Sequence, residues 1–214
     1  MTERGILFSG RLVRRINANA KTQTRRIAKF PPEATGWAID LDRNDKWWPM
    51  NRGKYVGDGI ASPYGLAGDR LYVREAWRTV ESLDELRPSM LAERVPIRYE
   101  ADEATRGKFR EPVGRYRHGR FMPRWASRID LDVVSVRIER LQNITAEDAI
   151  AEGVELGVPL DVIVNGERSK VAYFDARVAF AHLWCGVNGA DAWKANPWVW
   201  VVEFRRAAAQ ERAA

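Results

Sequence analysis

The chain has 214 residues, with 45% hydrophobic and 30% charged residues, a net charge of +6 and a sequence pI of about 9.7. This balance is ordinary for a soluble globular protein, and no apolar run approaches the roughly 18 residues needed to span a bilayer. A single Cys185 and two histidines exclude an internal disulfide and disfavour a zinc cluster. We therefore expect a cytoplasmic protein with no membrane partner, no metal and no organic cofactor; the oligomeric state is left open.

In the first third of the chain, the sequence predicts two strands, a helix and an inserted lobe. The apolar run GILFS (5–9) predicts a buried strand. RLVRRINAN (11–19) places its apolar residues on one stripe and predicts a short amphipathic helix. TQTRRIAKF (22–30) has a β-branched, alternating pattern and predicts a second strand. Residues 31–67 are rich in Pro, Gly, Trp and Asp without periodicity, so we expect an irregular inserted lobe there.

The middle of the chain predicts strands around a basic loop. GDRLYVREAW (68–77) predicts a strand that places Glu75 on the same face as Leu71 and Val73. A helical excursion at 82–91, a strand at 96–102 and a basic loop at 109–125 follow. RIDLDVVSVRIERL (128–141) predicts the clearest strand. Its apolar positions change from odd to even at Val133–Val134, which indicates a β-bulge.

The last third predicts two helices and a closing strand. TAEDAIAEGV (145–154) has Thr145 as N-cap, Asp148 near the capping-box position and Gly153 as a stop. FDARVAFAHLWCGVNG (174–189) predicts a second helix, and NPWVWVVEF (196–204) a final strand before a polar tail at 207–214. These elements predict an α+β fold, a single domain over 1–206 that forms a small mixed barrel with flanking helices.

The segment AKTQTRR (20–26), together with Glu75, concentrates the residues that can carry chemistry. Lys21 and Thr24 would point to opposite faces of a straight strand, so they share a pocket only if the chain turns between them. A threonine hydroxyl becomes a nucleophile when a base takes its proton, and a lysine amine can be that base. Glu75 on an apolar face needs a cationic partner, and it suits a proton shuttle or the base that activates water.

These residue types favour acyl transfer but leave open which group takes which proton. The competing interpretation is a solvated basic strand, with Glu75 paired to an arginine, and spacing alone puts it ahead. Further candidates are aromatic residues that can stack on a pyrimidine, Tyr64, Trp77 and Trp125, although each is as typical of a core. Arg26 and Arg124 can bind a carbonyl or a phosphate, although solvated arginine is at least as common.

Four blocks of the chain resemble the ASCH-domain superfamily, whose members have a PUA-like barrel. They are ILFSGRLVRRINANAKTQTRR, GDRLYVREAW, MPRWASRIDLDVVSVRIERLQNITAEDAIAEGV and NPWVWVVEFRR. The superfamily signature is a lysine–threonine–arginine segment after the first helix, here Lys21, Thr24 and Arg26, joined by an acidic residue, here Glu75. The resemblance does not cover residues 31–67 or 156–172.

One branch of this superfamily is similar to small bacterial amidohydrolases that remove the acetyl group from N4-acetylcytidine. Lys21, Thr24 and Glu75 match the triad of those enzymes in type and order. The resemblance implies an amidohydrolase that acts on N4-acylated cytosine nucleosides, with a modified nucleoside as its small-molecule substrate. This chain is longer than those enzymes, which leaves its range of acyl groups open.

The alternative function is an RNA-binding module or a ribonuclease that uses the same basic cleft. The high pI and the arginine-rich loop at 115–124 support it. For the amidohydrolase, we expect a largely buried Lys21 that contacts Glu75 or Thr24 in a pocket with at least one aromatic ring. An exposed Lys21 is what the competing interpretation predicts.

Overall fold

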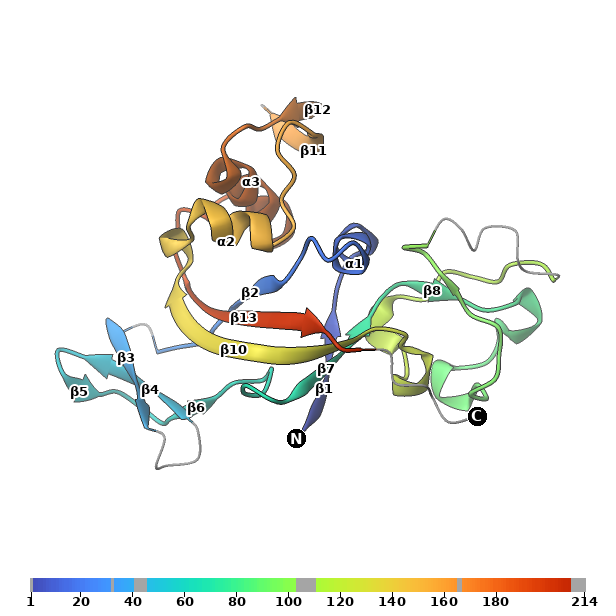
Figure 1. Ribbon diagram of the computed structural model, residues 1–214, viewed down its shortest axis with the longest axis horizontal. Helices are drawn as coiled ribbons and strands as arrows, with labels where there is room; N and C mark the ends of the chain where they lie inside the picture. Colours follow the sequence, from blue (N-terminus) through green and yellow to red (C-terminus); the bar gives the residue numbers. More distant parts are fainter. Residues whose placement is uncertain (1, 32, 41–45, 103–110, 165–166, 209–214) are drawn as a thin grey trace. The chain divides into compact units, whose positions relative to one another are not determined.

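The computed structural model describes residues 2–31, 33–40, 46–102, 111–164 and 167–208 (Figure 1). The chain divides into two compact units, each discontinuous in sequence. The first comprises Met1–Asn19, Ala67–Val133 and Arg205–Ala214, and the second Ala20–Leu66 and Val134–Phe204. The fold is of the α+β class and rich in strands. The single domain expected over 1–206 stays a prediction. In the described parts of the chain, no helix has the length and apolar character to cross a membrane.

The largest sheet is open and has the strand order β1-β7-β10-β13-β2. Its strands are β1 (Glu3–Leu7), β7 (Arg70–Arg74), β10 (Asp130–Arg140), β13 (Trp198–Arg206) and β2 (Gln23–Ile27). In the first unit, β1 runs parallel to β7, and β7 pairs antiparallel with the start of β10. In the second unit, β13 pairs antiparallel with β2 and places Val202 opposite Thr24. Strands β2, β7 and β10 lie within the segments where the sequence predicts strands, whereas β1 begins two residues before its predicted segment and β13 ends two residues after its own.

The buried face of β10 changes along its length, as its sequence predicts. Leu131 and Val133 are buried on odd positions, Val134 is 51% exposed, and Ile138 is buried on an even position. A change of buried face between Val133 and Ile138 is therefore confirmed, but Val134 does not join the buried face, and the bulge itself stays a prediction. The chain passes from the first unit to the second between Val133 and Val134.

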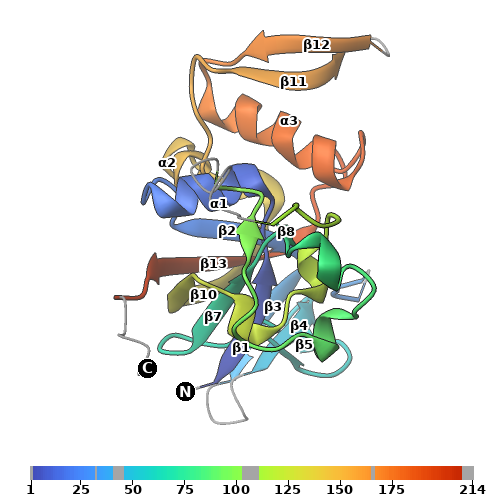
Figure 2. The same ribbon diagram turned by 90° about the vertical axis from the view of Figure 1, so that its right-hand side faces the viewer.

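Two helices and a hairpin complete one part of the second unit (Figure 2). Helix α2 (Ala146–Ala151) begins with a capping box formed by Thr145 and Asp148, as predicted, and Gly153 follows its end with a φ of +92°. Helix α3 (Ala176–Asn188) packs against α2. The hairpin β11 (Pro159–Val164) and β12 (Glu167–Ala172) occupies a segment for which the sequence predicts no element. A core cluster joins the two helices to β13: Leu141, Ile144, Ala149, Val154, Ala176, Ala179, Phe180, Trp184, Val199 and Val201.

The lobe at 31–67 is a small sheet, which corrects the expectation of an irregular segment. Strand β4 (Lys46–Asn51) pairs with β3 (Gly36–Asp40), β5 (Lys54–Tyr55) and β6 (Ile60–Ala61), antiparallel in each case. Two of these strands have only two residues, too few to show a period in the sequence. The lobe is held by aromatic packing: the ring of Trp47 meets that of Trp200 edge-on, 4.9 Å between centroids.

The remaining elements of the first unit are short. Helix α1 (Gly10–Asn17) buries Val13 and Ile16, as its pattern predicts. The predicted helical excursion consists of two 3-10 turns, η1 (Glu81–Leu83) and η2 (Pro88–Met90). Strands β8 (Trp77–Arg78) and β9 (Arg98–Tyr99) pair with each other, and 3-10 turns η4 (Gly119–Phe121) and η5 (Arg124–Ala126) lie in the basic loop. One more turn, η6 (Leu141–Asn143), follows β10 in the second unit.

Candidate functional site

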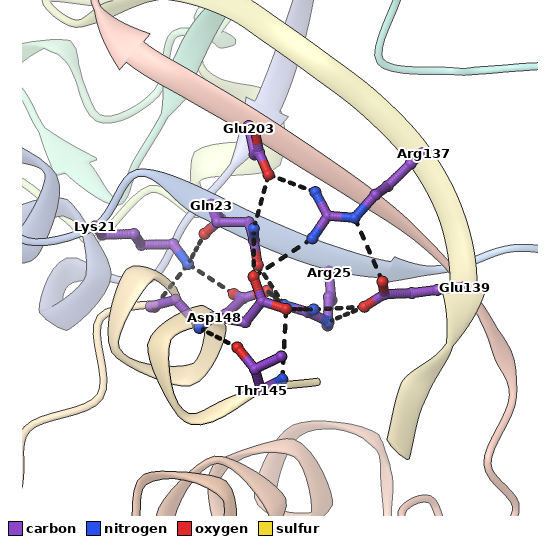
Figure 3. Close-up of polar contacts among 9 residues, drawn as sticks. Lys21, Gln23, Arg25, Arg137, Glu139, Thr145, Asp148 and Glu203 are labelled. Atoms are coloured by element: carbon purple, nitrogen blue, oxygen red, sulfur yellow. Dashed lines mark hydrogen bonds and ion pairs between the residues drawn. The ribbon is translucent and has the colours of Figure 1, made fainter. Parts of the chain in front are cut away.

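Lys21 lies two residues before β2 and is only 2% exposed, so the predicted burial is confirmed. Its Nζ donates to the main-chain oxygen of Gln23 at 2.7 Å, to that of Glu152 at 2.7 Å and to Glu152 Oε2 at 2.9 Å (Figure 3). An ammonium group has three N–H donors and no acceptor. Three acceptors around the amine therefore describe a protonated lysine, bound to the end of α2.

The surroundings of Lys21 have opposing effects on the pKa of its amine. Burial, the largest influence, lowers the pKa of the amine, because desolvation disfavours the charged form. The charge and hydrogen bond of Glu152 raise the pKa, and the charges of Arg26 and Arg25 lower it. The net result is a pKa below the usual lysine value of 10.5. Lys21 is thus a buried cation that loses its proton more readily than a solvated lysine.

A network of ion pairs surrounds Arg25, on the face of β2 that meets α2. The Arg25 guanidinium donates to Glu139 Oε1, to Asp148 Oδ2 at 2.8 Å and to Glu152 Oε1 at 3.3 Å. It also donates to the side-chain oxygen of Gln23. Arg25 is 3% exposed, so these partners provide the neutralisation that a buried charge requires.

The network continues to the surface of the second unit through β10 and β13 (Figure 3). Gln23 Nε2 donates to Asp148 Oδ1 at 3.0 Å and to Glu203 Oε1 at 3.2 Å. Arg137 pairs with Glu203, with Asp148 at 3.4 Å and with Glu139 at 3.3 Å. In the sequence, Asp148 signals only a helix cap. The other carboxylates carry no local signal, because their partners lie on other elements.

Thr24 and Arg26 belong to the opposite face of β2, because side chains alternate along a strand. Thr24 is 2% exposed, and its hydroxyl has no hydrogen-bond partner among the described residues. Tyr64 packs against the core cluster near β2, and the charge of Arg26 reaches its hydroxyl. Burial raises the pKa of Tyr64, and Arg26 opposes that rise. The structure therefore brings Arg26 and Tyr64, two predicted substrate-binding residues, into one neighbourhood.

Glu75 lies in the first unit, immediately after β7, and is 1% exposed on the same buried face as Leu71 and Val73, as predicted. Arg128 holds both of its carboxylate oxygens, with Nε at 3.0 Å from Oε1 and Nη2 at 3.3 Å from Oε2. Burial raises the pKa of Glu75, although the hydrogen bonds and charge of Arg128 oppose that effect. The arginine partner foreseen in the competing interpretation is thus present.

Arg128 is itself fixed on two further sides. Its Nη1 donates to Asp102 Oδ2 at 3.2 Å, and its guanidinium lies 3.9 Å from the centroid of the Tyr99 ring. The Tyr99 hydroxyl donates to the main-chain oxygen of Ala126 at 2.8 Å. This arrangement orients the Glu75 carboxylate through Arg128. No pattern in the sequence marks Arg128, which stands at the start of an ordinary strand motif.

The other predicted binding residues of the first unit have structural surroundings. Trp77 is fully buried in a core cluster, and Trp125 packs against the same cluster. Arg124 pairs with Glu3 at 2.6 Å and with Asp130 at 2.9 Å. A role of Trp77 and Trp125 in stacking, and of Arg124 in binding substrate, stays a prediction.

Comparisons with protein-family models, curated proteins and solved structures find no match for this chain. The resemblance of the sequence blocks to the ASCH superfamily therefore stays a prediction. Within the described ranges, no group of three or more His, Cys, Asp or Glu side chains is placed to hold a metal ion.

Proposed function

We propose that the protein is an amidohydrolase that removes the acyl group from N4-acylated cytosine nucleosides, built on a PUA-like, ASCH-type barrel. The observation that carries this proposal is the position of the Lys21 amine. It is hydrogen-bonded to the carbonyl of the peptide group that joins Gln23 to Thr24. A buried amine with a lowered pKa is therefore bound to the main chain next to Thr24, a buried threonine whose hydroxyl is bound to no other described residue.

In the proposed reaction, Thr24 Oγ attacks the acyl carbonyl carbon, and its proton passes to the neutral amine of Lys21. The carbon–nitrogen bond breaks, and the exocyclic nitrogen of cytosine takes a proton from Glu75 as the nucleoside leaves. Water then attacks the threonyl ester and gives a proton to Glu75. The carboxylic acid departs, and Thr24 recovers its proton from Lys21. Burial raises the pKa of Glu75 above the usual glutamate value, although Arg128 opposes that rise, and a raised pKa favours a carboxyl group that both gives and takes a proton.

Binding of the uncharged nucleoside is assigned to the same face of β2 that carries Thr24. Arg26 has donors for the carbonyl oxygen of the base or of the acyl group. The ring of Tyr64 can stack on a pyrimidine. Neither contact requires a phosphate on the substrate, so the proposal predicts binding that depends little on salt.

The test is release of cytidine from N4-acetylcytidine, followed by chromatography. Thr24→Ala should lower the rate by about a thousandfold or more, since it removes the nucleophile. Thr22→Ala is the matched control: Thr22 is an exposed threonine in the same segment and should retain wild-type rates. Lys21→Ala and Glu75→Gln test the other two groups. Equal rates for Thr24→Ala and Thr22→Ala would exclude Thr24 as the nucleophile.

A second candidate function, binding of single-stranded RNA, is favoured by the basic loop of the first unit. Tyr116 is 52% exposed and Phe121 59% exposed. Arg78 lies over the ring of Tyr116 at 5.8 Å, and Arg120 over that of Phe121 at 6.0 Å. Exposed rings beside guanidinium groups are the elements on which bases stack and phosphates bind.

This second function is tested by titrating the protein with a fluorescent oligoribonucleotide at increasing salt. Binding through several phosphates should weaken steeply, with a slope of about −0.7 for each phosphate contacted. Tyr116→Ala combined with Phe121→Ala should reduce the affinity and leave hydrolysis of N4-acetylcytidine unchanged. Affinity that is insensitive both to salt and to these substitutions would rule out this loop as an RNA-binding surface.

A further inference from the structure

Glu152 is the residue that the structure adds to the proposed site. It is the C-cap residue of α2 and 7% exposed. It supplies two of the three acceptors around the Lys21 amine, one from its side chain and one from its main chain. Its second carboxylate oxygen faces Arg25 Nη1 at 3.3 Å. Each oxygen of the carboxylate thus has its own cationic partner.

We propose that Glu152 is a positioning residue that acts through Lys21: it holds the amine at the start of β2 and keeps a proton on it in the resting protein. The catalytic meaning of this inference rests on the proposed amidohydrolase function. The hydrogen bonds and the retained proton of Lys21 do not depend on that function, and they can be measured without substrate.

Position follows from the hydrogen bonds. The amine is bound between the start of β2 and the end of α2, and a second contact joins the same elements: Thr22 N donates to the main-chain oxygen of Ala151 at 2.9 Å. A lysine side chain has four rotatable bonds, and fixing it costs about 2 kcal/mol of conformational entropy. Three acceptors in a buried environment offset that cost. Without the Glu152 carboxylate, the amine loses its charged acceptor, although the main-chain oxygens of Gln23 and of residue 152 stay in place.

Proton retention follows from the balance of charges. From β2, the cations Arg25 and Arg26 face Lys21 and disfavour its ammonium form. From α2, Glu152 is the anion that favours it, while Asp148 binds the cation Arg25 rather than the amine. A lysine that is desolvated without an anion tends to become neutral. The carboxylate of Glu152 therefore opposes the loss of the proton, and removing its charge should release the proton at lower pH.

The amine becomes a base only after this proton has left, which links Glu152 to the pH dependence of the reaction. If Lys21 accepts the proton of Thr24, the rate should rise with pH as Lys21 deprotonates. Glu152→Gln removes the charge and keeps an oxygen of similar position. This rise should then occur at lower pH by about one unit or more, the size of effect that a close charge has.

The experiment measures the titration of Lys21 directly by NMR, in protein with isotope-labelled lysine side chains and with Lys21→Arg to assign the signal. In Glu152→Gln, the midpoint should fall by about one pH unit or more. Glu139→Gln is the matched control, because Glu139 belongs to the same network and bonds Arg25 without bonding Lys21. It should reduce stability and leave the midpoint unchanged. Equal midpoints in wild type and Glu152→Gln would overturn the proposal.

Two further readouts keep the outcome decisive. In the wild-type protein, a slowly exchanging ammonium signal from Lys21 at pH 7 supports the inference, and a neutral amine at that pH overturns it, even if Glu152→Gln does not fold. The rate profile with N4-acetylcytidine should move with the NMR midpoint. A moved midpoint in a protein that never hydrolyses this substrate would support the role of Glu152 and reject the proposed function.

Discussion

Replacing Lys21 by Met should destabilise the protein by about 3–5 kcal/mol, the typical cost of breaking a buried ion pair by removing one partner. Methionine preserves the unbranched chain but leaves the 7%-exposed carboxylate of Glu152 with Arg25 alone. Two main-chain oxygens, those of Gln23 and Glu152, also lose their hydrogen bond from the amine. Such a loss is several times larger than the change expected at Lys29, an exposed lysine just after β2.

A double-mutant cycle assigns this loss to the pair. Glu152→Gln alone should cost about 1–3 kcal/mol, because the amine keeps its two carbonyl acceptors. In the Lys21→Met background, the same substitution removes a carboxylate that has lost its main partner and should cost little or nothing. The coupling energy should then be about 1–3 kcal/mol.

The measurement is urea unfolding at pH 7, followed by tryptophan fluorescence. Lys29→Met serves as the control and should change the free energy of unfolding by less than about 0.5 kcal/mol. If Lys21→Met and Glu152→Gln add within about 0.5 kcal/mol, the two side chains are not coupled, and the buried pair does not exist in solution.

Three further predictions concern neighbouring features. Gly119→Ala should destabilise the protein by about 1–3 kcal/mol in the same urea assay, because a Cβ there would lie 2.9 Å from the main-chain carbon of Glu75. Gly36→Ala is the control, because the space around Gly36 is open, and it should leave the free energy of unfolding unchanged. Arg128→Met should destabilise the protein strongly at pH 8 and less at pH 5. Burial already raises the pKa of Glu75, and protonation at lower pH removes the buried charge that Arg128 neutralises. Equal losses of stability at both pH values would contradict this prediction. Burial raises the pKa of Asp148, but the hydrogen bonds and charge of Gln23 and Arg25 lower it further, so the pKa in the folded protein lies below the usual 3.8. The stability that the Asp148 carboxylate contributes is therefore present above pH 3.8 and is lost as the pH falls through the lower pKa of the folded state. Asp148→Asn should therefore show a smaller loss of stability than wild type on acidification below about pH 4.

The sequence predicts those features that depend on neighbouring residues. The capping box joins Thr145 and Asp148, which are three positions apart, and the change of buried face in β10 follows from its own apolar residues. The burial of Lys21 was expected because the proposed chemistry requires it, and no pattern of neighbouring residues predicts it. The sheet within 31–67 escapes prediction, because its strands are short and held by aromatic packing such as that of Trp47 on Trp200.

The partners of the charged candidates are harder to predict because they are distant in sequence. Glu152 is 131 residues from Lys21, and Arg128 is 53 residues from Glu75. Both are common residues in ordinary helix and strand patterns, so nothing local distinguishes them. The sequence argument that Glu75 needs a cation on its apolar face was sound, but Arg128 supplies it within the first unit. The burial of Glu75 therefore requires no lysine, and the case for catalysis has to be decided at Thr24.

The substitution Thr24→Val tests most directly whether Thr24 takes part in catalysis, because valine keeps the shape and the β-branch of threonine and removes only the hydroxyl. A structural threonine of this burial would bond its hydroxyl to the protein, and losing that bond would cost about 1 kcal/mol. The Thr24 hydroxyl has no such partner among the described residues, so valine should leave the urea midpoint unchanged or raise it slightly. If Thr24 is the nucleophile, the same variant should lose hydrolysis of N4-acetylcytidine entirely, whereas Thr24→Ser should retain part of it. Full stability with full activity in Thr24→Val would exclude Thr24 from the chemistry, and a loss of stability would reveal a structural partner for the hydroxyl.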